Sequence, residues 1–141
     1  MSTFTDAEIE FLNSQRLGRL ATVGADGTPH VVPVAVFYDQ EDEALVVGAN
    51  AQFGDAVMLR SKKFRDLQRR PKAAVVIDAP SPIILEVRGD AETHLEGGGE
   101  VGRRLGTPFQ FAEQWIRIRP RRIVSVGVNG EGFASSSRDV G

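Results

Sequence analysis

The segment Ser61-Lys62-Lys63 carries the clearest chemistry in this chain. Serine is a favoured N-cap residue, so a helix that begins here places both lysines in its first turn, at the positive end of the helix dipole. Two ammonium groups are unfavourable there unless an anion binds too, and free backbone N–H groups at a helix start bind phosphate. The segment therefore predicts a phosphate site. The nearby Arg65, Arg69 and Arg70 leave open the alternative of a solvated basic helix face.

The elements around this segment suit a flat ring attached to a phosphate. Antiparallel strands are predicted before it, over Arg19–Val23, His30–Tyr38 and Ala44–Gly48. Asp26-Gly27 supplies the positive φ that a hairpin turn between the first two needs. Pro71 ends the helix just before a further apolar strand. Strand ends, a loop and a cationic helix start together could hold a ring with a phosphate tail.

The rest of the chain predicts a closed antiparallel barrel in one domain, residues 1–141. Short strands with turn signals between them and few helices are typical of such barrels. The remaining strands are predicted over Lys72–Asp78, Ile83–His94, Trp115–Arg119 and Arg122–Val128. Thr5 and Glu8 have the spacing of a capping box, which predicts a short helix at the N-terminus. The small, polar residues 129–141 predict a flexible tail.

The second predicted strand has two unusual features. Its sequence VVPVAVF is almost wholly apolar, so we expect both of its faces to be covered. Pro33 removes one backbone donor, which predicts an edge, a bulge or a ligand-facing position for this strand.

Composition excludes several classes of function. The net charge of −2 gives no general affinity for nucleic acid or for an anionic membrane. The absence of cysteine excludes disulfides, thiolate metal sites and cysteine nucleophiles. The N-terminus lacks the basic start and apolar run of a signal peptide, and no apolar stretch approaches the roughly 20 residues of a membrane span. We therefore expect a cytoplasmic protein.

No other motif predicts catalysis by side chains. The run Gly97–Gly102 matches G-x-G-x-x-G, but a helix after it could extend only to about Leu105 and no βαβ unit surrounds it, so a flexible surface loop is predicted. His30 and His94, the only histidines, have no triad or metal-ligand spacing, and no metal site is expected. Asp90 and Glu92 share a strand face, where solvation is expected. If the protein is an enzyme, a cofactor performs the chemistry.

Four segments together resemble the pyridoxamine-phosphate-oxidase-like flavin-binding family. The run SKKFRDLQRRP is similar to its phosphate-binding helix, and DGTPHVVPVAVFYD followed by ALVVG is similar to its cofactor-binding strands. EVRGDAE and IRIRPRRIVSVGV resemble a later strand and the final hairpin. The resemblance extends from about Thr5 to Val128. Within the family, the short length and the last hairpin look most like the actinobacterial deazaflavin-dependent branch, which includes tetracycline-pathway-type reductases.

The resemblance implies a six-stranded split β-barrel that forms a homodimer with a cofactor site at each interface. Lys62 and Lys63 would hold the phosphate beside the cap Ser61, and two strand segments would run along the ring. These segments comprise Val31, Val32, Pro33 and Val34 in one strand and Val47 and Gly48 in the other. Flavin oxidases of this fold carry a glutamine where this chain has Ile84 and a tryptophan where it has Val126. Both differences disfavour pyridoxamine phosphate oxidation.

Three hypotheses for function follow. The first is a reductase that uses coenzyme F-420, a deazaflavin, to transfer a hydride to a conjugated small molecule. The second is an oxidase or reductase of the same fold that binds FMN, and it shares Lys62 and Lys63 with the first. The third is a non-enzymatic carrier or sensor of the cofactor. Neither nucleic acid nor membrane is expected as a partner.

Overall fold

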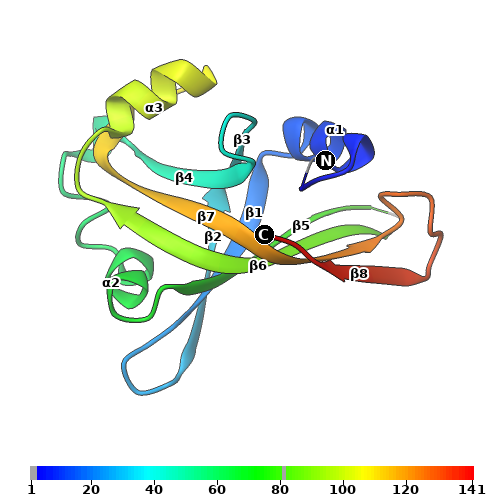
Figure 1. Ribbon diagram of the computed structural model, residues 1–141. Helices are drawn as coiled ribbons and strands as arrows, with labels where there is room; N and C mark the ends of the chain where they lie inside the picture. The colour runs from blue at the N-terminus through cyan, green and yellow to red at the C-terminus, as the bar shows by residue number, and fades with distance from the viewer. Residues whose placement is uncertain (1–2, 81) are drawn as a thin grey trace.

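A computed structural model describes residues 3–80 and 82–141 of the chain, and Figure 1 shows its arrangement. The helices are α1 (Asp6–Ser14), the short 3-10 helix η1 (Ala51–Phe53), α2 (Lys62–Arg69) and α3 (Gly98–Leu105). The strands are β1 (Leu17–Val23), β2 (Pro29–Ala35), β3 (Phe37–Asp39), β4 (Ala44–Asn50), β5 (Lys72–Ala79), β6 (Ile83–His94), β7 (Phe111–Val126) and β8 (Ser135–Asp139). No helix among these residues is long and apolar enough to span a membrane.

The strands form one antiparallel sheet in the order β2-β1-β5-β6-β7-β4-β3, with β8 paired to β7. This confirms a mainly β fold with short flanking helices. The described strands number eight, where the residue patterns predicted seven and the resemblance implied a six-stranded barrel, and their hydrogen-bonded path ends at β2 and β3 without closing. The predicted strand His30–Tyr38 is divided at Val36, whose N–H donates to the carbonyl of Arg16 at 2.8 Å.

Strand β7 is continuous through Pro120, where two separate strands were predicted. Its first half pairs with β4, its second half pairs with β8, and β6 follows it on the other side. The register between β6 and β7 shifts between Arg88 and Gly89, where Gly89 lies opposite Pro120, so the two strands form a β-bulge at this point. The backbones approach so closely that a Cβ on Gly89 would lie 2.1 Å from the carbonyl oxygen of Arg119. The bulge therefore lets a strand tolerate a proline that removes one backbone donor.

Two groups of buried side chains fill the molecule. The larger lies inside the curled sheet and includes Leu20, Val47, Phe64 and Ile118. The smaller lies between the sheet and α3, and it consists of Phe37, Val46, Phe111 and Trp115. Helix α3 contacts β7, and α2 contacts β1 and β6, so the two helices are fixed to different parts of the sheet.

Helix α1 begins with the predicted capping box. The Thr5 hydroxyl accepts from the N–H of Glu8 at 3.1 Å, and the Glu8 carboxylate accepts from the N–H of Thr5 at 3.0 Å. Glu8 is also fully buried, which an N-terminal helix position would not by itself require. Its carboxylate therefore has a second, tertiary role.

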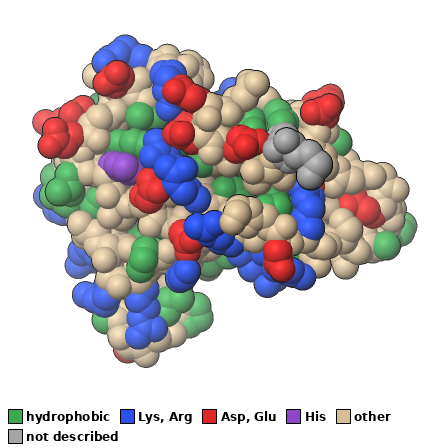
Figure 2. Space-filling view, in the orientation of Figure 1, with side chains coloured by type: hydrophobic (Ala, Val, Ile, Leu, Met, Phe, Trp, Pro, Cys, Tyr) green, Lys and Arg blue, Asp and Glu red, His purple; other side chains and the backbone are tan. Residues whose placement is uncertain are grey.

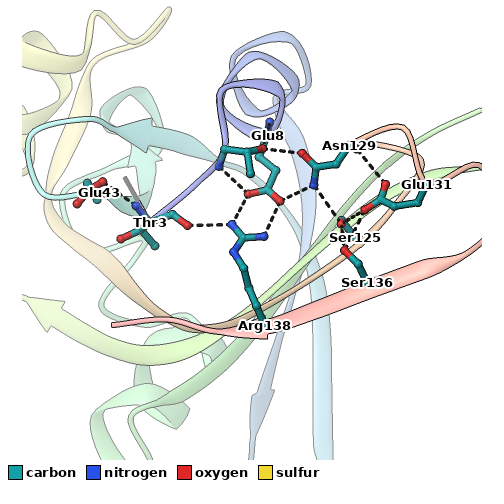
Figure 3. A network of polar contacts seen from close by, with 9 residues as sticks. Thr3, Glu8, Glu43, Ser125, Asn129, Glu131, Ser136 and Arg138 are labelled. Carbon is teal, nitrogen blue, oxygen red and sulfur yellow. Dashed lines mark hydrogen bonds and ion pairs between the residues drawn. The ribbon is translucent and has the colours of Figure 1, made fainter. Parts of the chain in front are cut away.

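That role is to hold the C-terminal strand, as Figure 3 shows. The two Arg138 guanidinium nitrogens donate to the two Glu8 oxygens at 2.9 and 2.6 Å, and Asn129 donates to the same carboxylate at 2.8 Å. Burial by itself raises the pKa of Glu8, but the hydrogen bonds from Arg138, Thr5 and Asn129 outweigh it and hold the pKa below its usual range. Residues 135–139 thus form a strand tied to α1, where composition predicted a flexible tail.

Strand β2 is at one end of the sheet order, which is one of the three positions that Pro33 left open. The expectation that both its faces are covered is wrong for the single chain. Val31 has 65% of its surface exposed and Pro33 is also exposed, whereas Val34 is buried. An apolar strand with one open face is suited to contact with a further molecule.

Candidate functional site

Helix α2 begins as the sequence predicted. Ser61 is its N-cap, and its hydroxyl accepts from the N–H of Phe64 at 3.3 Å. Phe64 and Leu67 are buried and fix the helix to the sheet. Lys62 and Lys63 therefore occupy the first turn, with the positive end of the helix dipole beneath them.

The structure separates the two lysines by what they contact. The Lys62 ammonium lies 3.1 Å from the Asp66 carboxylate one turn along the helix, and Asp66 also accepts from the Thr22 hydroxyl at 2.8 Å. Asp66 is buried, which alone would raise its pKa, but the hydrogen bonds from Thr22 and Lys62 lower it. The charge of Lys62 is thus partly neutralised within the helix. The i,i+4 spacing of Lys62 and Asp66 is a signal for this pair that is already present in the sequence.

Lys63 has no such neutralising group. Its side chain is partly buried, and no carboxylate within the described part of the chain forms an ion pair with it. Burial lowers the pKa of Lys63, because the charged form loses hydration without gaining a partner. A phosphate at the start of α2 would supply that partner. The geometry therefore fits an anion at Lys63 better than at Lys62.

The remaining basic residues of this region lie on the water-facing side of α2. Arg65 and Arg69 line a pocket of about 310 Å³ together with Lys62, Asp66 and the β1–β2 turn. Arg65 and Arg69 are exposed and form no ion pair among residues 3–80 and 82–141. The solvated basic face left open by the sequence is therefore present too, beside the partly buried Lys63.

The predicted ring-binding strands offer different surfaces. In β2, Val31 and Pro33 are exposed, Val32 is partly buried and Val34 is buried. In β4, the Val47 side chain is fully buried in the core, so only its backbone is available to a ligand.

Strand β4 lacks a β3 partner on one edge at the residues along which the cofactor ring was predicted to lie. The β3 ladder stops at Val46, which leaves Val47 and Gly48 paired only with β7. A Cβ on Gly48 would lie 2.5 Å from the Phe111 ring, so a side chain at this position would displace that ring. Strands β2 and β4 also contact each other, although they are not neighbours in the sheet order.

The two positions at which this chain differs from flavin oxidases of the fold lie opposite each other on neighbouring strands. Ile84 in β6 and Val126 in β7 are directly opposite each other in the antiparallel register, and both are partly buried. They form one apolar cross-strand pair where flavin oxidases resembling this chain would carry glutamine and tryptophan.

The charged side chains of β6 and β7 form ion pairs, where solvated carboxylates were expected from the sequence. Glu92 lies between Arg117 and Arg119, and Asp90 lies between Lys72 and Arg121. Burial raises the pKa of Glu92, but hydrogen bonds from Arg119, His94 and Arg117 lower it to about 2. Figure 2 shows basic and acidic side chains interleaved across the middle of this face.

The histidines do not form a catalytic arrangement with these carboxylates. His94 stacks on Trp115 with ring centroids 4.1 Å apart, and its Nε2 lies 3.1 Å from Glu92. His30 lies on β2 and is partly buried. No group of three histidine, aspartate or glutamate side chains among the described residues could hold a metal ion.

The glycine-rich segment is a helix and not the loop that was predicted. Gly98 and Gly102 allow α3 to lie against β7, because a Cβ on Gly98 would be 1.9 Å from the carbonyl oxygen of Ala112 and one on Gly102 would be 3.0 Å from the Phe111 ring. The strands that flank it, β6 and β7, are antiparallel, so the segment is not part of a βαβ unit. Its glycines serve helix packing, which explains the match to the dinucleotide motif.

Comparison with known proteins agrees with the antiparallel fold. Residues 4–129 match the family described as pyridoxamine 5'-phosphate oxidase. The chain is 37% identical over 134 residues to a 5a,11a-dehydrotetracycline/5a,11a-dehydrooxytetracycline reductase of Streptomyces rimosus, with 91% of this chain and 86% of that protein covered.

Solved structures of the same fold include two with clear similarity. A conserved hypothetical protein of Mycobacterium tuberculosis is 25% identical with a TM-score of 0.64, and the match covers 85% of this chain and 82% of that one. A pyridoxamine 5'-phosphate oxidase-related, FMN-binding protein of Nostoc punctiforme is 13% identical with a TM-score of 0.67, over 100% of this chain and 98% of that one. The fold is accordingly of the split-barrel class, and the chain belongs to the pyridoxamine 5'-phosphate oxidase family.

Proposed function

We propose that this protein is a coenzyme F-420-dependent reductase that transfers a hydride to a conjugated small molecule. The observation that carries the cofactor site in this proposal is Lys63, a partly buried ammonium without a carboxylate partner among the described residues, in the first turn of α2. The negative charge of a cofactor phosphate at this position would compensate for the hydration that the Lys63 ammonium loses on burial. The reductase named among the relatives of this chain supports the reaction class.

The cofactor fits the residues that the chain provides. Lys63 and the free N–H groups at the start of α2 would bind its phosphate, with Lys62 as a weaker partner because Asp66 shares its charge. Val31 to Val34 and the backbone at Val47 and Gly48 would lie along the ring. When bound, a deazaflavin supplies a hydride and reacts poorly with oxygen.

The substrate side of the site is proposed to be apolar. By the resemblance described above, Ile84 and Val126 would lie beside the ring, where they would exclude water and offer no hydrogen bond, so orientation of the substrate would depend on shape and stacking. No acid–base pair of side chains is placed to exchange protons with substrate in the part of the chain that the structure describes, so solvent would supply the proton of the reduced product. An electron-poor enone or quinone fits these requirements.

We further propose a homodimer with the cofactor at the interface. The support is the open apolar face of β2, where Val31 and Pro33 are exposed at the edge of the sheet, together with Leu17 in the adjacent strand, which is 56% exposed. A two-fold contact would cover this surface. Light scattering at micromolar concentration should give twice the chain mass, and a monomeric mass would contradict the interfacial site.

Two alternatives are retained because they share Lys63. An FMN-dependent oxidase or reductase would use the same phosphate site, and a non-enzymatic carrier or sensor would bind the cofactor without turnover. The pair Ile84 and Val126 favours the deazaflavin, since it provides no polar contact to a flavin ring edge.

One set of titrations separates the three possibilities. Purified protein is titrated with coenzyme F-420 and with FMN, and the reduced F-420 complex is then mixed with an enone or quinone. Tighter binding of F-420, with return of its visible absorbance at a rate independent of oxygen, is the expected result. Preferential binding of FMN with formation of hydrogen peroxide would contradict the F-420 assignment, and tight binding without turnover of any acceptor would favour the carrier.

A further inference from the structure

A second cavity lies away from α2, between α3 and the segment that leads into β7. Its volume is about 500 Å³, within the usual range for small-molecule pockets. Its wall includes Gly99, Gly102 and Arg103 from the helix and Thr107, Phe109 and Phe111 from the chain that follows. It shares no residue with the pocket beside α2.

One side of this cavity is aromatic. The rings of Phe109 and Phe111 lie 5.5 Å apart at an angle of 37°. Phe111 is almost fully buried, whereas Phe109 is partly exposed. Such a surface favours contact with a flat, apolar ring.

Gly99 leaves the helix side of the cavity open without a packing reason. A Cβ on Gly99 would meet no atom closer than 3.5 Å, in contrast to 1.9 Å for its neighbour Gly98. Within a helix, alanine is more favourable than glycine, so the fold itself would accept a side chain here. Gly99 itself is buried, but it lines the cavity, so a large side chain at this position would occupy part of the space that a ligand would use.

Arg103 adds an uncommitted positive charge. Its neighbour Arg104 donates two hydrogen bonds of 2.9 Å to the buried Asp39, but Arg103 forms no ion pair within residues 3–80 and 82–141. The Glu113 carboxylate accepts from the Gly97 N–H at 3.5 Å, and both this carboxylate and the Arg103 guanidinium lie 3.5 Å from the position that a Cβ on Gly99 would take. Glu113 does not pair with Arg103, which leaves the guanidinium free for a ligand.

We propose that this cavity binds a flat aromatic anion, such as an aromatic carboxylate or a phenolate. The partly exposed Phe109 ring would hold its face, the missing side chain of Gly99 would leave room for its edge, and Arg103 would bind the anionic group. The cavity shares no residue with the proposed phosphate site, although Phe111 also packs against Gly48 of the proposed ring-binding strand, and the proposal does not depend on which cofactor binds there.

Isothermal titration of the full chain with 2-naphthoate, compared with neutral 2-naphthamide, tests the proposal. We expect the carboxylate to bind more tightly than the amide. Arg103→Gln should weaken 2-naphthoate about tenfold and remove the preference over the amide. Arg19→Gln removes the same charge from an exposed surface pair and should change neither value.

Two substitutions of Gly99 test binding in the cavity and also control for folding. Gly99→Leu should abolish binding of both compounds, while Gly99→Ala should leave the melting temperature equal or higher. Unchanged affinity in Arg103→Gln, or in a folded Gly99→Leu variant, would overturn the proposal. So would the absence of 2-naphthoate binding to the wild-type protein, or competitive displacement of 2-naphthoate by coenzyme F-420 or FMN, which would place the compound in the cofactor site.

Discussion

The segment 60–70, which contains helix α2, and strands β5–β7 each hold six Lys and Arg residues but differ in what those residues contact. Of the six basic residues between positions 60 and 70, only Lys62 forms an ion pair among the described residues. All six basic residues of the three strands form ion pairs. These are Lys72, Arg88, Arg117, Arg119, Arg121 and Arg122. The cations of the sheet therefore have structural partners within the chain, whereas those of α2 are available to an external anion.

The difference matters most where a cation is also buried. An exposed arginine without a partner, such as Arg65, is hydrated and costs little. Lys63 loses part of its hydration and gains no carboxylate, so its positive charge is unfavourable in the isolated chain. Arg138 is the opposite case, because its charge is matched to the fully buried Glu8. Four predictions test this contrast, in order of decreasing effect.

Arg138→Ala should be the most damaging of these substitutions. It leaves the Glu8 carboxylate buried without its cation, and it removes the contact that holds β8 to α1. We expect a loss of about 3 kcal/mol in the free energy of unfolding, at the lower end for buried pairs because Arg138 keeps part of its surface in water. Urea denaturation measures this. The double variant Glu8→Gln/Arg138→Gln should recover part of the loss, and equal stability of all three proteins would contradict the assigned role.

Lys63→Ala should affect binding rather than stability. Loss of a charge-assisted phosphate contact is expected to cost about 1.5–3 kcal/mol in cofactor affinity, whereas Lys62→Ala should cost less because Asp66 shares its charge. Fluorescence titration with the preferred cofactor measures both, and unchanged melting temperatures confirm the fold. Equal affinities of wild type and both variants would refute the phosphate site, and a larger loss in Lys62→Ala would make Lys62 the principal phosphate ligand instead.

Cofactor affinity should fall at alkaline pH because of the same lysine. Burial lowers the pKa of Lys63, so in the free protein it loses its proton at a pH below the ordinary lysine range of about 10.4. Binding of phosphate favours the charged form, so affinity decreases as pH rises through the lowered pKa. Titrations from about pH 7 upward should reveal this decline. The cofactor affinity of Lys63→Arg should stay constant across the same pH values, because arginine keeps its proton there. An identical decline in that variant would assign the effect to another group.

Arg88→Gln should have the smallest effect. Arg88 is exposed and pairs with Glu86 two residues away on the same strand. Exposed pairs contribute little to stability, so we expect no resolvable change in melting temperature and no change in cofactor affinity. Thermal unfolding and the same fluorescence titration check the two values. A reduced affinity would show that the paired cations of the sheet also reach the ligand, which would remove the distinction between the two regions.

Local features of this protein follow from its sequence alone. Thr5 and Glu8 reach each other within one helical turn, Ser61 caps the residues that follow it, and Pro33 lacks a donor wherever it lies. The positive φ of Gly27 follows from the turn type in the same way. Each depends on neighbours within a few positions, so residue type and spacing are sufficient to predict it.

Features that depend on distant partners arise only in the folded chain. Strand β7 continues through Pro120 because Gly89 accommodates a bulge, and β8 is ordered because Arg138 meets a carboxylate 130 residues away. Likewise Lys62 and Lys63 are adjacent in the sequence, but only the fold buries Lys63 while it leaves Lys62 beside Asp66. Burial and pairing of a charge depend on what packs around it, and no local pattern of residue types contains that information.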